Sequence, residues 1–357
     1  MAKKSSLKNS IGFERIAAFI AVAVVVFFIG KYFYEIGTSE AGTRGLDSNY
    51  VFISNKGSDE NPGSYQSPYR SIRAAFEAAK SIPADNVTIG ILDDSYEVTA
   101  VDTTGFPWLE GPLTATEANI QLTGMQVSVT PRGEVAFTPQ LTTVSLPVFP
   151  GIFGFKVENG GLAISNIDFN LTNYPDFDVQ TGGELKITNN KFRKEISSAS
   201  VGTMLSIEAF QNGIMKIGDN DFYFKKYRYN SIPNVALNVN NHSSQNTQIY
   251  SNNFYYQFLD QEPNLQFTPS YTPYIGIQAW GNLIDISFNK FTIDTDTYPG
   301  NKVPTEESKA NVGVMYMYGN HGNFAGNNFT KFYGTPLIIQ APSGSSGQSA
   351  SVVDNKS

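Results

Sequence analysis

The sequence predicts an all-β solenoid, in which similar coils stack on one another, preceded by one apolar N-terminal helix. Two observations carry this prediction. An Asn-x-Phe motif recurs through the second half of the chain, and an apolar run lies near the N-terminus. A repeat of about 20 to 50 residues is typical of stacked architectures and not of doubly wound sheets or sandwiches.

The apolar run extends from Ile16 to Tyr34 and contains a single charge, Lys31. At about 1.5 Å per residue its length is roughly 28 Å, enough to span the hydrocarbon core of a bilayer. Four basic residues precede it: Lys3, Lys4, Lys8 and Arg15. The positive-inside rule places them in the cytoplasm. We therefore expect a cytoplasmic segment (1–15), a single-pass transmembrane signal-anchor (16–34) and an extracytoplasmic remainder at the cell surface. A cleaved signal peptide is the alternative.

Residues 35–49 are rich in Gly, Ser and Thr and predict a short linker. A strand-like segment and a cluster of turn formers, Gly57 and Asn61-Pro62-Gly63, come next. Ser71 is then a candidate N-cap for a helix over 71–81. Ile72, Ala75, Phe76 and Ala79 share one face of that helix. Because an uncovered solenoid end exposes unpaired strand edges, we expect this amphipathic helix to cap the solenoid.

The first coils follow the cap. Val87–Ile91 alternates like a strand, and Asp93–Tyr96 is interpreted as a solvated turn, not as a pair of catalytic carboxylates. Ile120–Leu122 and Val127–Val129 are further strand candidates, without a clean repeat.

Regular repeats occupy the rest of the chain. In each, a strand-like run is followed by a Gly/Asn break and then by a second strand that ends in the motif. The motif pairs are Asn190/Phe192, Asn220/Phe222, Asn252/Phe254, Asn289/Phe291 and Asn327/Phe329, and a sixth segment keeps Phe169 with Ile167 in place of the asparagine.

Stacking explains why these residue types recur. Parallel neighbouring strands lie about 4.8 Å apart, so equivalent residues form columns. An asparagine column can donate and accept amide hydrogen bonds along its length, while a phenylalanine column stacks as an apolar spine. The residue between them is polar every time, so we expect it to point outward: Asp168, Lys191, Asp221, Asn253, Lys290 and Asn328.

The Asn-x-Phe repeats resemble the coils of right-handed parallel β-helix proteins of the pectate-lyase superfamily. The Gly57-Ser-Asp-Glu-Asn-Pro-Gly63 segment, with the strand before it and the helix after it, is similar to the N-terminal motif of many secreted β-helix proteins. The resemblance covers roughly residues 50–340. It implies a right-handed parallel β-helix over 50–340 but no single activity, because this scaffold carries lyases, hydrolases, epimerases and inert spikes.

Composition narrows the functional classes. The chain has no cysteine, so disulfides, thiol nucleophiles and cysteine metal sites are excluded. A net charge of −7 argues against nucleic acid as a partner. Residues 341–357, rich in Ser and Gly, predict a flexible tail.

The segments after each Asn-x-Phe are the longest insertions, and stacking should bring them to one side of the solenoid. They are rich in tyrosine, which offers flat surfaces to sugar rings. The candidate substrate-binding residues are Tyr229, Tyr255, Tyr256, Tyr271 and Tyr274. The alternative interpretation is that these tyrosines pack the insertions onto the coils.

Catalytic residues are harder to assign. A β-eliminating lyase needs a base, for which Arg228, Lys225 and Tyr227 are candidates, and often Ca²⁺ held by carboxylates. Asp260, Asp294 and Asp296 could hold such a metal. A glycoside hydrolase would need two carboxylates facing one bond, and no convincing pair is present.

The sequence therefore favours a membrane-anchored, extracytoplasmic β-helix that binds surface or environmental polysaccharide and, in its enzymatic version, processes it as a lyase. The alternative is a non-catalytic surface spike or adhesin. Whether the protein is an enzyme, and whether it forms a homo-oligomer, are both left open.

Overall fold

The computed structural model describes residues 49–98, 119–131, 134–146, 153–157, 160–171, 177–196, 203–227, 234–259, 274–281, 283–294, 311–317, 321–332, 334–340, 349–353 and 355–356. The described residues fall into two units, 129–136 in the first and the rest of those from 49 onward in the second. In the first unit, the Thr130 N–H donates to the Glu134 carbonyl oxygen at 2.8 Å. The second unit holds the solenoid.

The cytoplasmic segment, the signal-anchor and nearly all of the linker expected over 1–48 lie outside the described residues. Across the part of the chain that is described, no helix combines the length and the apolar character needed to cross a membrane.

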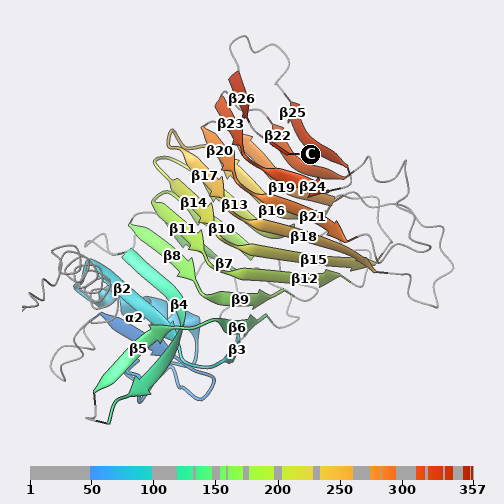
Figure 1. Ribbon diagram of the computed structural model, residues 1–357. Coiled ribbons are helices and arrows are strands. Elements are labelled where there is room, and N and C mark those ends of the chain that lie inside the picture. The colour runs from blue at the N-terminus through green and yellow to red at the C-terminus, as the bar shows by residue number, and fades with distance from the viewer. Residues whose placement is uncertain are drawn as a thin grey trace, which may run out of the picture. The chain divides into compact units, whose positions relative to one another are not determined.

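The described strands form three sheets, and neighbours along each sheet pair in parallel (Figure 1). The eleven-stranded sheet contains β1 (Tyr50–Ile53), β2 (Asn86–Ile91), β4 (Asn119–Val129), β8 (Gly161–Ser165), β11 (Glu184–Thr188), β14 (Ile214–Gly218), β17 (Thr247–Tyr250), β20 (Ile284–Ser287), β23 (His321–Ala325) and β26 (Ser349–Val353), with β5 (Val135–Pro139) paired to β4 off this path. The seven-stranded sheet contains β7 (Phe153–Val157), β10 (Phe177–Thr181), β13 (Thr203–Ala209), β16 (Asn234–Asn241), β19 (Tyr274–Gly281), β22 (Val312–Met317) and β25 (Thr335–Gln340). The eight-stranded sheet contains β3 (Ser95–Glu97), β6 (Thr142–Ser145), β9 (Ile167–Asn170), β12 (Lys191–Ile196), β15 (Asp221–Tyr227), β18 (Asn253–Leu259), β21 (Lys290–Asp294) and β24 (Asn328–Lys331).

Each regular coil contributes one strand to each sheet, as β10, β11 and β12 do, so the solenoid is a parallel β-helix. The expected coil of two strands is wrong in this respect. The asparagine does not lie near the end of the second strand but marks a corner, and the phenylalanine belongs to a third strand.

The corner arises from the residue before the asparagine. Five residues at this position have a positive φ between 54° and 64°: Asn189, Asp219, Ser251, Phe288 and Gly326. Asn166, which precedes Ile167 at the equivalent corner, has a φ of 56°. A single left-handed residue turns the chain sharply, and asparagine, aspartate and glycine tolerate this conformation best. The chain thus leaves the eleven-stranded sheet and enters the eight-stranded sheet within two residues.

The asparagines after this turn form a continuous, buried hydrogen-bonded ladder. Both the backbone N–H and the side-chain amide of Asn220 donate to Oδ1 of Asn252, at 3.1 and 3.0 Å. The same amide also donates to the Ile187 carbonyl oxygen of the preceding coil at 2.8 Å. The pattern repeats from Asn190 through Asn289 to Asn327. The predicted asparagine column is confirmed.

The phenylalanine column lies inside the coil next to the ladder. Successive rings from Phe169 to Phe329 stack with centroids 4.7 to 5.1 Å apart and interplanar angles of 4 to 14°. Rings this close to the strand spacing are in register with the backbone. These rings and the aliphatic residues of the other two sheets make one continuous core.

Helix α2 (Ile72–Ser81) caps the N-terminal end as expected. Ser71 accepts the Ala74 N–H, and Ile72, Ala75, Phe76 and Ala79 are buried. Asp59, from the N-terminal motif, accepts hydrogen bonds from the Ser71 N–H and hydroxyl at 2.7 and 2.8 Å. The aspartate of the motif therefore ties the turn to the start of the cap.

The last described residues differ from the expected flexible tail over 341–357. Strand β26 pairs with β23, and Asn355 extends the ladder by accepting the Asn327 N–H and side-chain amide, each at 2.9 Å. The Asn-x-Phe motif does not identify this segment as a coil, because Asn355 is followed by Lys356 and Ser357 and not by a phenylalanine.

Substitutions in the two columns test the stacking. Asn252→Ala leaves donors and acceptors of neighbouring coils unpaired, so it should cost about 1–3 kcal/mol of unfolding free energy. Phe254→Ala opens a cavity in the ring stack and should cost about 3–5 kcal/mol. Chemical denaturation measures both.

Asn253→Ala is the matched control, because Asn253 lies between the two columns and is exposed. Equal stability of all three variants would contradict the stacking account.

Candidate functional site

The strands that precede the long insertions have their carboxyl-terminal ends aligned along the same side of the eight-stranded sheet. Lys225 of β15 pairs with Gln257 of β18, which pairs with Asp294 of β21. Ile196 at the end of β12 pairs with Lys226 of β15. In each of these coils the chain therefore leaves the sheet at the same side, as the stacking of the coils predicts.

Five of the predicted site residues lie outside the described residues: Arg228, Tyr229, Asp260, Tyr271 and Asp296. Tyr227 and Asp294 lie in β15 and β21, but their side chains are also outside the described part. Of the three candidate bases, Lys225 alone has a described side chain, and it is exposed. The catalytic and calcium assignments stay predictions.

The assignment of Tyr256 and Tyr274 to substrate binding is wrong. Tyr256 is 1% exposed and Tyr274 is 0% exposed, and their rings stack on each other with centroids 4.2 Å apart. The reason is strand alternation. Tyr256 lies two residues after the inward-facing Phe254, so it faces the core as well.

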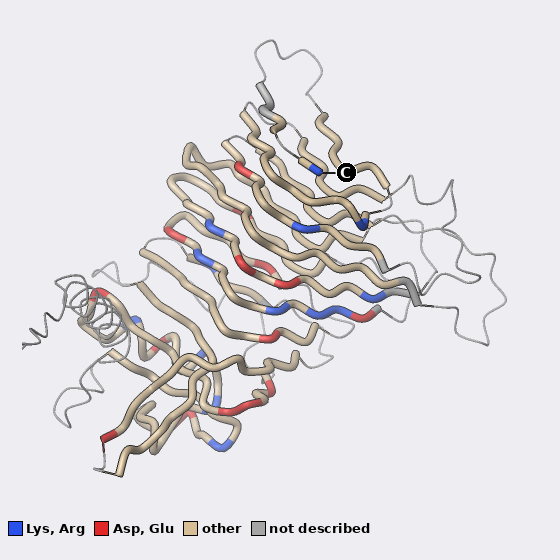
Figure 2. Tube along the Cα trace, viewed as in Figure 1, with Lys and Arg blue, Asp and Glu red and all other residues tan. Residues whose placement is uncertain are grey.

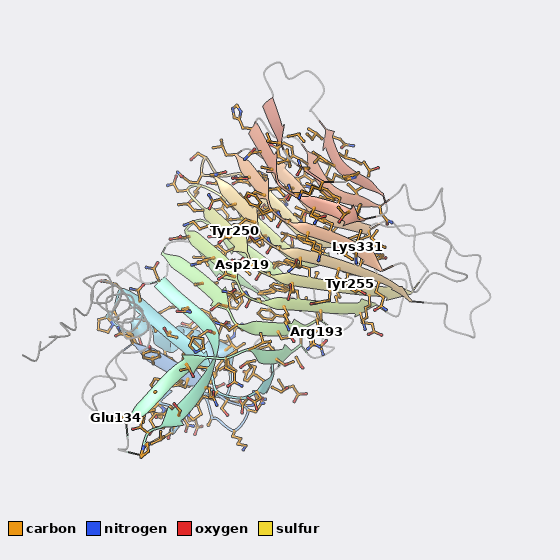
Figure 3. All side chains as sticks on the ribbon, viewed as in Figure 1. Glu134, Arg193, Asp219, Tyr250, Tyr255 and Lys331 are labelled. Atoms are coloured by element: carbon orange, nitrogen blue, oxygen red, sulfur yellow. The ribbon has the colours of Figure 1, made fainter. Side chains whose placement is uncertain are left out.

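Tyr255 points to the opposite side, away from the core. It pairs across the sheet with Tyr223, and the two rings lie 5.8 Å apart at 54°. Arg193 precedes Tyr223 in the same column, on the neighbouring strand. Arg193 and Tyr255 lie on the same side of the eight-stranded sheet (Figure 3). We call this surface the tyrosine face, defined by the outward side chains of Asp168, Lys191, Arg193, Asp221, Tyr223, Tyr255 and Lys290.

Charges on the tyrosine face alternate along the solenoid. In the column between the asparagine and phenylalanine columns, Asp168 pairs with Lys191, which pairs with Asp221. The Arg193 Nε lies 2.7 Å from Oδ1 of Asp168. Opposite charges on adjacent strands stabilise a sheet, so part of this pattern holds the coils together. Figure 2 shows the basic residues of β12 on this sheet.

Asp168 lies on the outward side of the sheet, opposite Lys191, but it is only 8% exposed. The side chain of Arg193, which is 47% exposed, forms its ion pair. Further along the column, Asn253 donates to Asp221 at 2.8 Å and is exposed.

Tyr223 has an altered acidity. Burial raises its pKa above the ordinary value, and the nearby carboxylates of Asp221 and Asp168 raise it further. A phenol is protonated at neutral pH even at its ordinary pKa of about 10, so Tyr223 can act as a hydrogen-bond donor there. A phenol with a raised pKa is a poor general base at that pH, because only the phenolate accepts a proton and very little phenolate is present.

The tyrosine face can stack an apolar ring surface on Tyr223 and Tyr255 and can pair an anion with Lys191 or Lys290. Within the described ranges, no three His, Asp or Glu side chains are placed so as to hold a metal ion.

The sequence reasoning missed Tyr223, Lys191 and Arg193 as members of a site. A usable signal was present: on β12, β15 and β18, the residues one and three places beyond the phenylalanine face outward, and the residue two places beyond faces inward. Counting from Phe222 and Phe254 assigns Tyr223 and Tyr255 to the surface and Tyr256 to the core.

No protein-family model matches this chain, and the comparison with curated proteins finds no match. Among solved structures, a rhamnogalacturonan lyase is similar with a TM-score of 0.23 and 10% sequence identity, over 82% of this chain and 73% of that chain. A TM-score this low bears on neither the fold nor the activity of this chain, which rest on the strands and residues described above.

The buried tyrosines predict how stability depends on pH. Burial raises the pKa of Tyr316 to about 12 and also raises that of Tyr274. The unfolded chain releases these protons at about pH 10, whereas the folded chain retains them. Stability should therefore be complete below about pH 10 and fall as the pH rises toward 12.

Melting temperatures measured across this range check the effect. The Tyr274→Phe/Tyr316→Phe double variant should flatten the decline, whereas Tyr250→Phe, on the outward side of another sheet, should not. An equally steep decline in the double variant would rule out these two phenols as its source.

Proposed function

We propose that this protein is a membrane-anchored, extracytoplasmic β-helix that binds acidic polysaccharide along the tyrosine face. The observation that carries the proposal is the outward pair of Tyr223 and Tyr255, 5.8 Å apart, in a surface that also presents Lys191, Arg193 and Lys290. Aromatic rings suit the apolar faces of sugars, and cations suit carboxylates.

The geometry of the columns favours a polymer as the ligand. Equivalent side chains repeat once per strand, about every 4.8 Å along the solenoid. The rise per sugar of an extended glycan is close to this spacing. A chain lying across the strands could therefore place similar groups over successive rungs, from Arg193 to Tyr223 to Tyr255.

The chemistry of Tyr223 suits binding. Its phenol is protonated at neutral pH and can donate a hydrogen bond to a sugar oxygen. The enzymatic version, a pectate-lyase-like polysaccharide lyase, would use Arg228, Lys225 or Tyr227 as base and Ca²⁺ at Asp260, Asp294 and Asp296. A non-catalytic spike or adhesin would need neither the tyrosines nor those groups.

The proposed layout keeps residues 16–34 as the membrane anchor, with 1–15 in the cytoplasm and 35–49 as the linker. The apolar run, which contains the single charge Lys31, and its basic flank support this layout. We also propose a right-handed solenoid, because connections between parallel strands of one sheet are almost always right-handed.

Extraction tests the anchor. The full chain should stay with the membrane pellet at high pH and high salt and should enter solution only with detergent. Deletion of residues 1–44 should release it, and release of the intact chain by salt alone would contradict an anchor.

Retention on an immobilised uronate polymer tests the function. Tyr255→Ala and Tyr223→Ala should each weaken retention about tenfold, or ~1.4 kcal/mol, because each removes one of the two outward rings. Tyr250→Ala is the matched control, since Tyr250 is an outward tyrosine of the eleven-stranded sheet.

Unsaturated products, measured with and without Ca²⁺ and lost in Arg228→Ala, would establish the lyase version. If the wild type is not retained and yields no products, the polysaccharide proposal fails and the spike or adhesin is the surviving account.

A further inference from the structure

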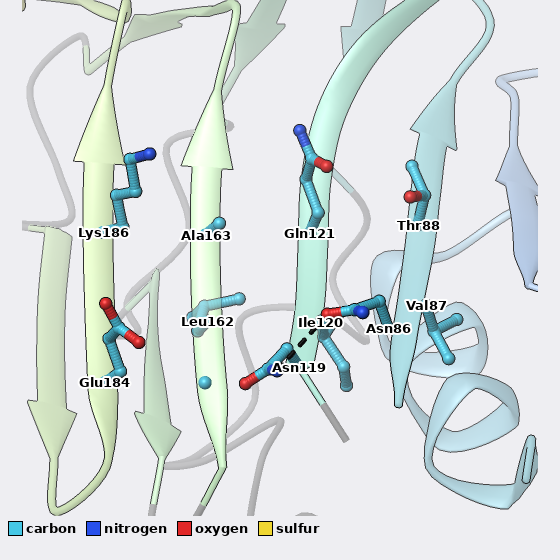
Figure 4. Close-up of a pocket in the computed structure, with 11 residues that line it drawn as sticks. Asn86, Val87, Thr88, Asn119, Ile120, Gln121, Leu162, Ala163, Glu184 and Lys186 are labelled. Atoms are coloured by element: carbon cyan, nitrogen blue, oxygen red, sulfur yellow. Dashed lines mark hydrogen bonds between the residues drawn. The ribbon is translucent and has the colours of Figure 1, made fainter. Parts of the chain in front are cut away.

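A second candidate binding surface lies on the outward side of the eleven-stranded sheet, on a different sheet from the tyrosine face. It is a shallow trough of about 260 Å³ that crosses β2, β4, β8 and β11 (Figure 4). Its floor is formed by Gly161 and Ala163 of β8. Asn119 and Gln121 of β4 stand on one side and Glu184 and Lys186 of β11 on the other.

The trough exists because β8 carries the smallest side chains in two consecutive outward rows. One row runs from Asn119 through Gly161 to Glu184, and the next runs from Gln121 through Ala163 to Lys186. Strands lie about 4.8 Å apart, so the two walls are roughly 10 Å apart across β8. Every neighbour of the two small residues within these rows is polar.

Gly161 leaves room for the side chain of Asn119. A Cβ atom at Gly161 would lie 2.4 Å from Oδ1 of Asn119, so a larger residue would move the end of that side chain. The Asn119 side-chain amide donates to Oδ1 of Asn86 at 3.3 Å, which directs its carbonyl oxygen over Gly161. Figure 4 shows this hydrogen bond and the oxygen turned toward β8. The trough therefore presents a held hydrogen-bond acceptor above a floor of backbone.

The opposite wall supplies charge of both signs. Glu184 is held by Lys216, with Nζ and Oε1 3.0 Å apart. Lys186 is exposed and forms no ion pair within the described residues, and its neighbours in the row are Ala163 and Lys216. Because Lys216 is already paired with Glu184, Lys186 is the cation of this wall that can attract an incoming anion.

We propose that the trough binds one uronic-acid unit. The ring would lie on Gly161 and Ala163, its hydroxyls would donate to Asn119 and Glu184, and its carboxylate would pair with Lys186. The volume supports a single sugar, because it falls just below the roughly 300–1,000 Å³ typical of sites for drug-sized ligands. The proposal shares the ligand class of the proposed function and rests on it for that class, but it concerns a separate site.

The test uses the full chain in detergent and ligand-detected NMR titration with D-galacturonate, with D-galactose as the neutral counterpart. Titrations are made in the Tyr255→Ala background, which removes an outward ring of the tyrosine face. Lys186→Gln should weaken galacturonate binding about tenfold and leave galactose binding unchanged, because it removes one charge-assisted hydrogen bond. Lys186→Arg should keep the affinity.

Filling the trough gives a second, independent variant. Ala163→Gln places a long polar side chain between Gln121 and Lys186 and should abolish binding of both sugars in this background. Its fold is checked by circular dichroism and melting temperature. If its melting temperature is well below that of the parent, Ala163→Thr is used instead, because threonine is smaller and β-branched and is favourable in a strand.

The outcomes separate the two sites. Galacturonate binding that is absent in this background, or unchanged by filling the trough, overturns the trough while polymer retention on the tyrosine face can still stand. Equal affinity for both sugars, unaffected by Lys186→Gln, overturns the uronate assignment. Polymer retention that survives Tyr255→Ala and Tyr223→Ala but is lost in Ala163→Gln supports the trough and overturns the tyrosine face.

Discussion

The asparagine ladder is the interaction on which the rest of the solenoid depends. In each ladder side chain, both the carbonyl oxygen and the amide nitrogen form hydrogen bonds. Oδ1 of Asn252 accepts from the backbone and side chain of Asn220, and its own amide donates to Asn289 and to the Ile217 carbonyl oxygen. A buried amide left unpaired would be costly, so each coil can join the next only with its corner directly over the previous one.

A fixed corner sets the register of everything that follows it. Because Asn190, Asn220 and Asn252 are superposed, Phe192, Phe222 and Phe254 must stack, and the strands beyond them pair residue for residue. The insertions of different lengths that follow do not disturb this order, since the next corner restores it. Loop length can therefore vary while the scaffold is constant.

Both proposed binding surfaces are consequences of this register. The tyrosine face requires Tyr223 and Tyr255 to fall on adjacent strands at the same outward position. The trough requires the small residues of β8 to fall between the longer residues of β4 and β11. In each case, side chains far apart in the chain become neighbours at the strand spacing, and repetition produces a surface that no single coil contains.

The sequence by itself determined the repeat, the asparagine and phenylalanine columns and the helical cap, because each depends on residue types recurring at corresponding points or at helical spacing. Tertiary structure alone decided that Tyr274 is a core residue, because it begins a strand that follows no Asn-x-Phe motif. The directions of Tyr223 and Tyr256 can be counted from the phenylalanine, but only once the corner is known to begin a new strand. Tertiary structure also decided that Asn355 belongs to the ladder, and that Gly161 lies beneath Asn119. These relations are contacts between coils, and a contact between coils exists only once the chain has been wound and its corners hydrogen-bonded to one another.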